Sequence, residues 1–368
     1  MNASSPVRVL TRRDLNRALL ERQQLLRRES GTVAEMIERL VGLQAQAPLA
    51  PYVALWSRLE GFDPADLSGL MTARDVVRGT LLRSTIHLVT AEDCLTMWPL
   101  MYPVAERGLR GAFGKRLAGA DLDTVVAFGT ELLSREPYTR SRLGEVLGER
   151  WPDWDATAMA YAVSSLTGTV QVTPRGVWGQ TGPAALQTIE SWLGKSPVPD
   201  PSIDELVLRY LAVFGPASTA DVQMWSGLTK LREVLDRLRP GLRVYADEHG
   251  RELFDVPDGP LPDAETPAPV RFLPEFDNLL LGHADRRRVN PTGRPVPLPP
   301  GNGAAMGNVL IDGDYAADWR HHRGADPSLR VTTHGPVAAA VQEAIEAEAV
   351  ELLGLIGSKD TPVVVTSA

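Results

Sequence analysis

The chain has 368 residues, of which 43% are hydrophobic and 23% are charged. This composition is typical of a folded protein with roughly two to four compact units. The sequence contains no run of about 18 apolar residues, so we expect no transmembrane helix, and its start shows no signal-peptide pattern. The single cysteine, Cys94, excludes an internal disulfide, a cysteine zinc cluster and an iron–sulfur cluster. We therefore expect a cytoplasmic protein.

The charge is distributed unevenly along the chain. The net charge of −8 argues against a protein that simply coats DNA. Residues 1–118, however, contain 16 Lys and Arg against 12 Asp and Glu, whereas the remainder contains 22 against 34. Arginine predominates in the basic part, as a phosphate-binding surface favours, although genome-driven arginine usage would give the same bias.

Three helices followed by a β-hairpin recur along the sequence. The order is seen best within 201–257, where helix caps, glycine stops and apolar periodicity agree. It is typical of the winged-helix arrangement, a helix-turn-helix with a β wing. The predicted elements are helices over 204–214, 220–226 and 229–238, and a hairpin over 242–257 that turns at 248–250.

Two further copies make chance a weaker explanation than it is for one copy. The copy at 121–182 has predicted helices over 123–134, 140–147 and 155–166, and a hairpin over 169–182 that turns near 174–176. The looser copy at 8–90 has predicted helices near 11–26, 32–43, 50–60 and 63–73, and paired strands over 76–89.

In the last hundred residues, strand-like segments replace the repeated pattern of three helices and a hairpin. Proline-rich stretches at 191–202 and 257–270 read as linkers. Beyond them, strand-like segments and one helix over about 336–354 indicate a small β-rich domain, preceded by a basic Pro/Gly-rich loop at 286–303. We thus predict an α+β fold with three tandem winged-helix modules and a β-rich C-terminal domain. The predicted boundaries are 1–95, 96–190, 200–257 and 268–368.

Several common catalytic motifs are missing. GLRGAFGKR (108–116) lacks the glycine spacing of a phosphate loop, and neither a nucleophile elbow nor an HExxH motif occurs. Asp312 and Asp314 are better explained by a hairpin turn than by a metal site. We expect no metal ion and no cofactor.

Two glutamines are candidate catalytic residues. Gln44 and Gln46 lie near the end of a predicted helix, where residues two apart would point to opposite sides. They share a side only in an extended segment, so both amides can serve one site only if this stretch has left the helix, which Pro48 makes plausible. The alternative is a pair of exposed glutamines at a helix terminus.

Other polar residues stand in apolar surroundings. Arg83 and His87 lie in LLRSTIHLV, where His87 can equally be a satisfied core histidine. Trp178 can be a packing residue. Glu275 and Asp277 in LPEFDNLLL can provide an acid or can mark the junction of a strand and a turn.

Five segments resemble the winged-helix DNA-binding family of the AlkZ type. They are LTRRDLNRALLERQQLL, GLQAQAPLAPYVALWSRL, LLRSTIHLVTAED, GVWGQTG and LPEFDNLLLGHADR, in the order of the family and over nearly the whole chain. The resemblance implies three winged-helix units and a β-rich part around a DNA-sized channel. The glutamine–apolar–glutamine signature of the family matches Gln44-Ala45-Gln46.

The resemblance also implies a reaction. The expected activity is that of a monofunctional, monomeric DNA glycosylase that hydrolyses N7-alkylated purines in double-stranded DNA. The substrates would be bulky adducts or interstrand crosslinks from a genotoxic natural product, removed in self-resistance or repair. Gln44 and Gln46 would orient water, with Glu275, Asp277 or His87 in electrostatic or positioning roles. Phosphate contacts would come from Arg83, Arg286, Arg287 and Arg288.

Two other functions remain open on the sequence. A winged-helix transcriptional regulator would bind a specific DNA site without excising bases, and it would usually dimerise, yet the sequence shows no clear dimerisation helix. A protein-interaction scaffold would suit the acidic two-thirds of the chain and would not bind DNA at low salt.

Overall fold

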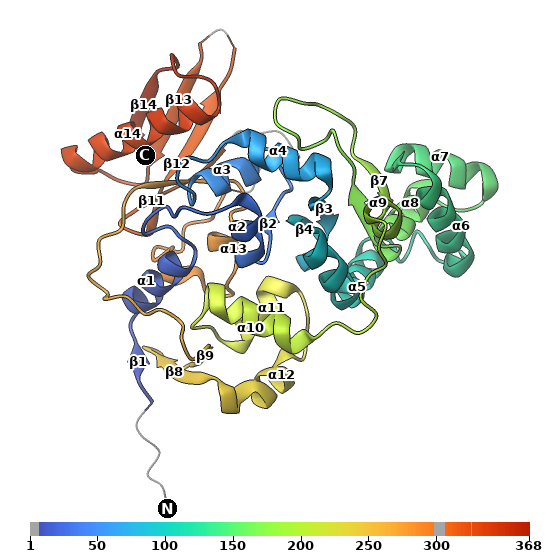
Figure 1. The fold of residues 1–368 in the computed structure, drawn as a ribbon, viewed down its shortest axis with the longest axis horizontal. Helices are drawn as coiled ribbons and strands as arrows, with labels where there is room; N and C mark the ends of the chain where they lie inside the picture. The colour runs from blue at the N-terminus through green and yellow to red at the C-terminus, as the bar shows by residue number, and fades with distance from the viewer. Residues whose placement is uncertain (1–6, 298–305, 325) are drawn as a thin grey trace, which may run out of the picture. The chain divides into compact units, whose positions relative to one another are not determined.

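The computed structural model describes residues 7–297, 306–324 and 326–368 (Figure 1). The chain forms two compact units, each considered by itself below. The first unit contains the residues up to Pro64, Asp204–Trp225 and Lys230–Ala368, and the second contains Ala65–Ile203 with Ser226–Thr229. The first unit is thus assembled from segments far apart in the sequence.

Side-chain caps fix where the first helices of this unit begin. Thr11 and Thr32 each accept a hydrogen bond from the backbone three residues on, and Asp14 and Glu35 return the bond in capping boxes. The helices of the unit are α1 (Arg12–Arg22), α2 (Val33–Arg39), α3 (Ala50–Trp56), α10 (Ile203–Phe214), α11 (Thr219–Ser226), α12 (Leu231–Leu238), α13 (Asn278–Leu281) and α14 (Ala339–Leu355).

A small sheet follows α12 directly. β8 (Arg243–Asp247) and β9 (Glu252–Asp255) form an antiparallel hairpin, and β1 (Val9–Leu10) pairs with β8 in parallel. The order α10–α11–α12–β8–β9 agrees with the three helices and the hairpin predicted for 201–257.

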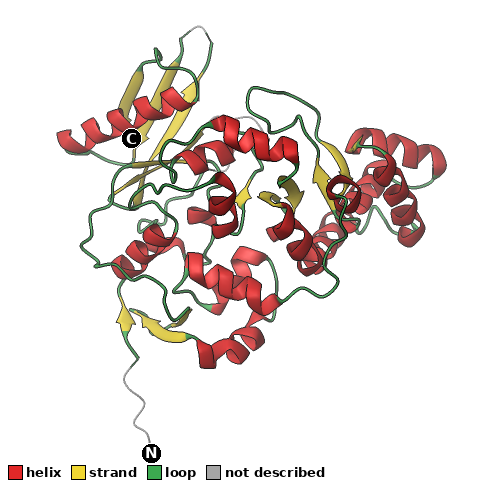
Figure 2. Cartoon of the chain, viewed as in Figure 1, coloured by secondary structure: helices red, strands yellow, loops and turns green. Residues whose placement is uncertain are grey.

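The C-terminal third contains a five-stranded sheet with the order β10–β11–β12–β13–β14. Neighbouring strands are antiparallel except β13 and β14, which are parallel and are connected through α14 (Figure 2). The core of this sheet includes Val53 and Trp56 of α3 beside Phe272, Trp319 and Ile345. The strands are β10 (Arg271–Pro274), β11 (Met306–Ile311), β12 (Asp314–His322), β13 (Ser328–Thr333) and β14 (Val363–Ser367).

The second unit packs helices against a twisted set of short strands. Its strands follow the order β4–β3–β6–β7–β5, with antiparallel neighbours. Its helices are α4 (Pro64–Ala73), α5 (Ala91–Phe113), α6 (Leu122–Arg135), α7 (Arg140–Arg150), α8 (Ala156–Leu166) and α9 (Ile189–Leu193), and its strands are β3 (Val76–Thr80), β4 (Ile86–Thr90), β5 (Tyr138–Thr139), β6 (Thr169–Gln171) and β7 (Ala185–Thr188).

The structure corrects three predicted elements. The hairpin predicted over 169–182 has its returning strand at Ala185–Thr188, because prolines and left-handed glycines occupy the stretch between β6 and β7. The helix predicted over 32–43 ends at Arg39. The long helix α5 was not predicted, since Pro99 and Pro103 lie inside it and proline ordinarily interrupts a helix.

The mixed α+β class is confirmed. The interpretation of the chain as three winged-helix modules around a channel, with the four predicted boundaries, stays a prediction. No helix among the described residues is long and apolar enough to cross a membrane.

Candidate functional site

The Gln44–Gln46 stretch lies outside any helix, between α2 and α3 of the first unit. After α2 ends at Arg39, Val41 (φ 54°) and Gly42 (φ 88°) adopt left-handed conformations. This turn directs the chain away from the helix axis, and Leu43–Gln44 forms the short strand β2. The stretch has therefore left the helix, as a site shared by both amides requires.

Burial within the stretch alternates. Gln44 is only 7% exposed and Gln46 is half-buried, while Ala45 between them is fully buried. Ala45 thus lies in the core, with Gln44 largely buried beside it and Gln46 more open to solvent. That both amides serve one site stays a prediction.

The start of α13 holds this stretch in place. The Nδ2 group of Asn278 donates a hydrogen bond of 2.7 Å to the carbonyl oxygen of Gly42, two residues before Gln44. Figure 1 shows α13 beside α2 and β2. Because Asn278 is itself buried, the bond satisfies a carbonyl that water reaches poorly.

Asp277 is committed to a buried ion pair. Its two carboxylate oxygens accept hydrogen bonds of 2.9 and 3.0 Å from the guanidinium of Arg58, and both side chains are fully buried. Arg58 also donates to the carbonyls of Gln23 and Ala54, and Asp277 caps α13. A carboxylate held in this way positions the loop and is poorly placed to face a substrate.

Glu275, two residues earlier, has different surroundings. It is 6% exposed, and burial raises the pKa of its carboxyl to about 8. Its backbone N–H donates to the carbonyl of Met306, which fixes the chain at the end of β10. Phe276 then takes a left-handed conformation (φ 63°), which is unfavourable for an aromatic residue.

His87 lies in the second unit on β4, opposite Gly79 of β3. It is fully buried, and its Nδ1 atom lies 3.0 Å from the carbonyl oxygen of Thr85. Burial, and then the charge of Arg83, lowers its pKa to about 3. The neutral ring donates from Nδ1, and within the described part of the chain its Nε2 atom has no hydrogen-bond partner. At neutral pH the Nε2 atom of His87 therefore carries no proton and cannot donate one.

Arg83 lies at the turn between β3 and β4. Arg83 and Ser84 both have left-handed conformations, with φ of 54° and 57°, and the Ser84 hydroxyl donates to the carbonyl of Val104. Two such residues in succession are costly, so this turn is fixed by its contacts. Trp178, also in this unit, is half-buried, and its backbone N–H donates to Ser68.

Not all of the predicted DNA-contacting arginines are accessible. Arg288 is only 6% exposed and donates to the carbonyls of Phe214 and Pro216, so its guanidinium cannot reach a phosphate. The prediction for Arg288 is corrected on this ground. Arg287 is exposed but shares its charge with Asp285 at 2.6 Å, while Arg286 is half-buried in the same turn.

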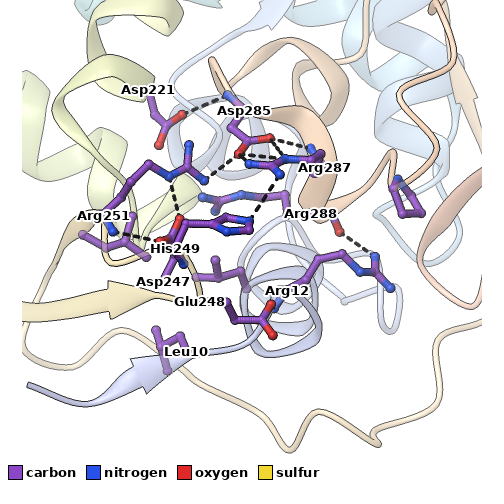
Figure 3. A pocket seen from close by; sticks show the side chains of 13 residues that line it. Leu10, Arg12, Asp221, Asp247, Glu248, His249, Arg251, Asp285, Arg287 and Arg288 are labelled. Atoms are coloured by element: carbon purple, nitrogen blue, oxygen red, sulfur yellow. Dashed lines mark hydrogen bonds and ion pairs between the residues drawn. The ribbon is translucent and has the colours of Figure 1, made fainter.

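This turn borders a cavity of about 170 Å³ in the first unit. Figure 3 shows that its charged side chains face one another, with Arg251 between Asp247 and Asp285, and His249 beside Arg287. Each of these carboxylates is satisfied within the protein. The cavity therefore lies between the tip of the β8–β9 hairpin and the 285–288 turn.

Two residues that sequence reasoning missed support the Gln44 stretch. Asn278 was hidden inside LPEFDNLLL, and Arg58 inside LWSRL, where an arginine in an apolar helix was the only available signal. Both are buried. Arg58 donates to Asp277, and Asn278 donates to the carbonyl of Gly42 just before β2. Among the described residues, no group of three or more His, Cys, Asp or Glu side chains is arranged to hold a metal ion.

Comparison with known proteins identifies the class. A family model described as "DNA glycosylase AlkZ-like" matches residues 37–355. The fold is similar to that of Streptomyces sahachiroi DNA glycosylase AlkZ, with a TM-score of 0.76 and 18% identity over 97% of this chain and 100% of that chain. No curated protein matches the sequence.

The family match covers most of the chain, including the candidate site, and defines a DNA glycosylase. The protein belongs to the AlkZ-like DNA glycosylase family. The resemblance stated from the five sequence segments is thereby confirmed.

Proposed function

We propose that the protein hydrolyses the N-glycosidic bond of N7-alkylated purines in double-stranded DNA, with Gln44 and Gln46 as the catalytic residues. The observation that supports this most is that Gln44 and Gln46 lie in non-helical chain, anchored at Gly42, in a member of this family. Both side chains are neutral amides, each with an acceptor oxygen and a donor nitrogen, and can hold a water molecule near C1′.

The chemistry explains why neutral residues suffice. An N7-alkylpurine nucleotide is already cationic, so the base departs without protonation, and the main tasks are to orient water and to stabilise an oxocarbenium-like sugar. No amine nucleophile is needed, so the enzyme is monofunctional and leaves an abasic site. The substrates we propose are bulky adducts or interstrand crosslinks of a genotoxic natural product.

The proposed DNA contacts come from Arg83, Arg286 and Arg287. Arg83 is presented by a fixed turn, and the other two lie in the turn beside the β8–β9 hairpin. Arginine pairs well with phosphate because its planar guanidinium donates two parallel hydrogen bonds. We expect binding to weaken as salt rises.

The direct test uses duplex DNA with small and bulky N7-alkylguanine adducts, followed by alkaline cleavage of abasic sites. Wild type should give strand breaks only after alkali, and Gln44→Ala and Gln46→Ala should each reduce the rate at least tenfold. Gln342→Ala, on an exposed face of α14, is the matched control and should keep the wild-type rate. Tight binding of a specific sequence with no base release from any adduct would instead indicate a regulator.

A further inference from the structure

Glu275 differs from other buried carboxylates of the first unit. Asp255 is paired with Arg22 at 2.6 Å, and Asp277 with Arg58 at 2.9 Å. Within the described part of the chain the Glu275 carboxyl has no ion pair, and the one hydrogen bond that affects its pKa comes from its own backbone. A buried acid without a cation is costly in a folded protein and suggests that the cation is supplied from outside.

The backbone around Glu275 is fixed on both sides. The N–H of Glu275 donates to the carbonyl of Met306, and Asp277, two residues on, accepts from Arg58. Asn278 then bonds to Gly42 at 2.7 Å, so the loop that carries Glu275 is tied to the stretch that carries Gln44. Phe276 between them keeps a left-handed conformation, which persists only where its surroundings enforce it. The loop that carries Glu275 is thus joined, through Asn278, to the segment that leads into Gln44.

We propose that Glu275 is the counter-charge of the reacting nucleotide and selects substrates that carry a positive charge at the base or at the sugar. This inference rests on the proposed function. When a cationic alkylpurine nucleotide enters, the carboxyl releases its proton to solvent and the carboxylate faces the cation. The C1′–N9 bond then breaks, with its electron pair leaving on the neutral base.

The same residue then closes the proton balance. The oxygen of the oriented water forms the new bond to C1′, and its proton passes to the Glu275 carboxylate, which returns to its neutral buried form. Burial raises the pKa of the Glu275 carboxyl to about 8, in agreement with a neutral resting form at pH 7. Two charged residues close by, Asp277 on the same loop and Arg58 just after the end of α3, are paired with each other.

The inference is tested by binding, so that it does not depend on turnover. One duplex carries a pyrrolidine abasic nucleotide, which is cationic at pH 7, and the other a neutral tetrahydrofuran analogue of the same shape. Wild type should bind the cationic duplex at least tenfold more tightly, and Glu275→Gln should bind both within about threefold. Glu265→Gln changes an exposed glutamate in the same way and should keep the wild-type preference.

A second readout follows the proton. Calorimetric titration of the pyrrolidine duplex in two buffers of different ionisation heat should show release of about one proton by wild type at pH 7, and none by Glu275→Gln. Glu275→Leu should lose the preference as well, so the result does not depend on one variant folding. A preference retained by both variants, or absent from wild type, would overturn the inference. Failure to release any alkylated base would instead contradict the proposed function and leave the binding result unaffected.

Discussion

Two carboxylates separated by one residue have opposite electrostatic surroundings in this protein. Asp277 is matched by a guanidinium and contributes to the stability of the fold, whereas Glu275 is buried without a cation. From the sequence the two could not be told apart, because Arg58 lies 219 residues from Asp277. Only tertiary contacts decide which acid is committed to structure.

Glu275→Gln should stabilise the protein at neutral pH. The folded pKa of about 8 lies above the unfolded value of about 4.3, so the folded state binds the proton more tightly. As the pH rises from about 4.3 to about 8, the free energy of unfolding of wild type therefore falls, by at most about 1.4 kcal/mol per pH unit. The amide side chain of Glu275→Gln does not titrate, so the variant lacks this contribution. Urea unfolding at pH 5 and pH 7.5 measures this. If the difference in free energy of unfolding between the variant and wild type were the same at both pH values, the raised pKa of Glu275 would be contradicted.

Two buried histidines should make the fold sensitive to acid. Burial lowers the pKa of His87 and of His283 to about 3, below the unfolded value of about 6.5. As pH falls below 6.5 the unfolded state gains protons that the folded state refuses, and each histidine lowers the free energy of unfolding by at most about 1.4 kcal/mol per pH unit. Between pH 7 and pH 5, the free energy of unfolding, measured with urea, should fall less in His87→Gln than in wild type. His322→Gln is the control and should behave as wild type.

At the level of elements, the short helix α13 positions the strand β2. A side-chain hydrogen bond from Asn278 of α13 to the carbonyl of Gly42, the residue just before β2, joins them. Asn278→Ala should leave a buried carbonyl without its partner, which costs about 1–3 kcal/mol. We expect base release to slow at least tenfold while the affinity for DNA, measured by fluorescence anisotropy, stays within about twofold. A loss of affinity with unchanged turnover would show that the bond serves binding.

Elements with clear local signals were predicted well. α10, α11, β8 and β9 match the predicted positions within one or two residues, because apolar periodicity, caps and a glycine turn agree there. The position of β7 and the presence of α5 were not predictable from local rules. A long proline- and glycine-containing loop separates β6 from β7, and tertiary packing of buried residues such as Trp98 and Met101 overrides two prolines inside α5.

The Gln44 site was predicted only in part. The spacing of the two glutamines required that this stretch leave the helix, and the structure shows α2 ending at Arg39 and a short strand at Leu43–Gln44. The bond that anchors this stretch at Gly42 comes from Asn278, more than two hundred positions away, and no local pattern reports it. The same limit explains why Arg288 was assigned to DNA: its burial against Phe214 and Pro216 depends on the tertiary fold.

At the level of the whole molecule, a chain of net charge −8 can bind DNA only through a surface where positive charge is concentrated. Arg286→Ala should lower the magnitude of the slope of log K against log salt by about 0.9, as loss of one phosphate contact does. Arg288→Ala should leave this slope unchanged and lower the melting temperature instead, because its guanidinium is bonded inside the fold. Equal effects of the two substitutions on the slope would contradict this distinction.

The discontinuous make-up of the first unit has a consequence for synthesis on the ribosome. The two partners of the Asn278–Gly42 bond are 236 residues apart, so at about 5–20 residues per second the nascent Gln44 stretch waits roughly 10 to 50 s for its anchor. The intervening second unit is contiguous from Ala65 to Ile203 and can fold during that interval. Incomplete chains released from stalled ribosomes would thus carry the glutamines without the clamp that orders them. We expect such incomplete chains to be inactive in base excision.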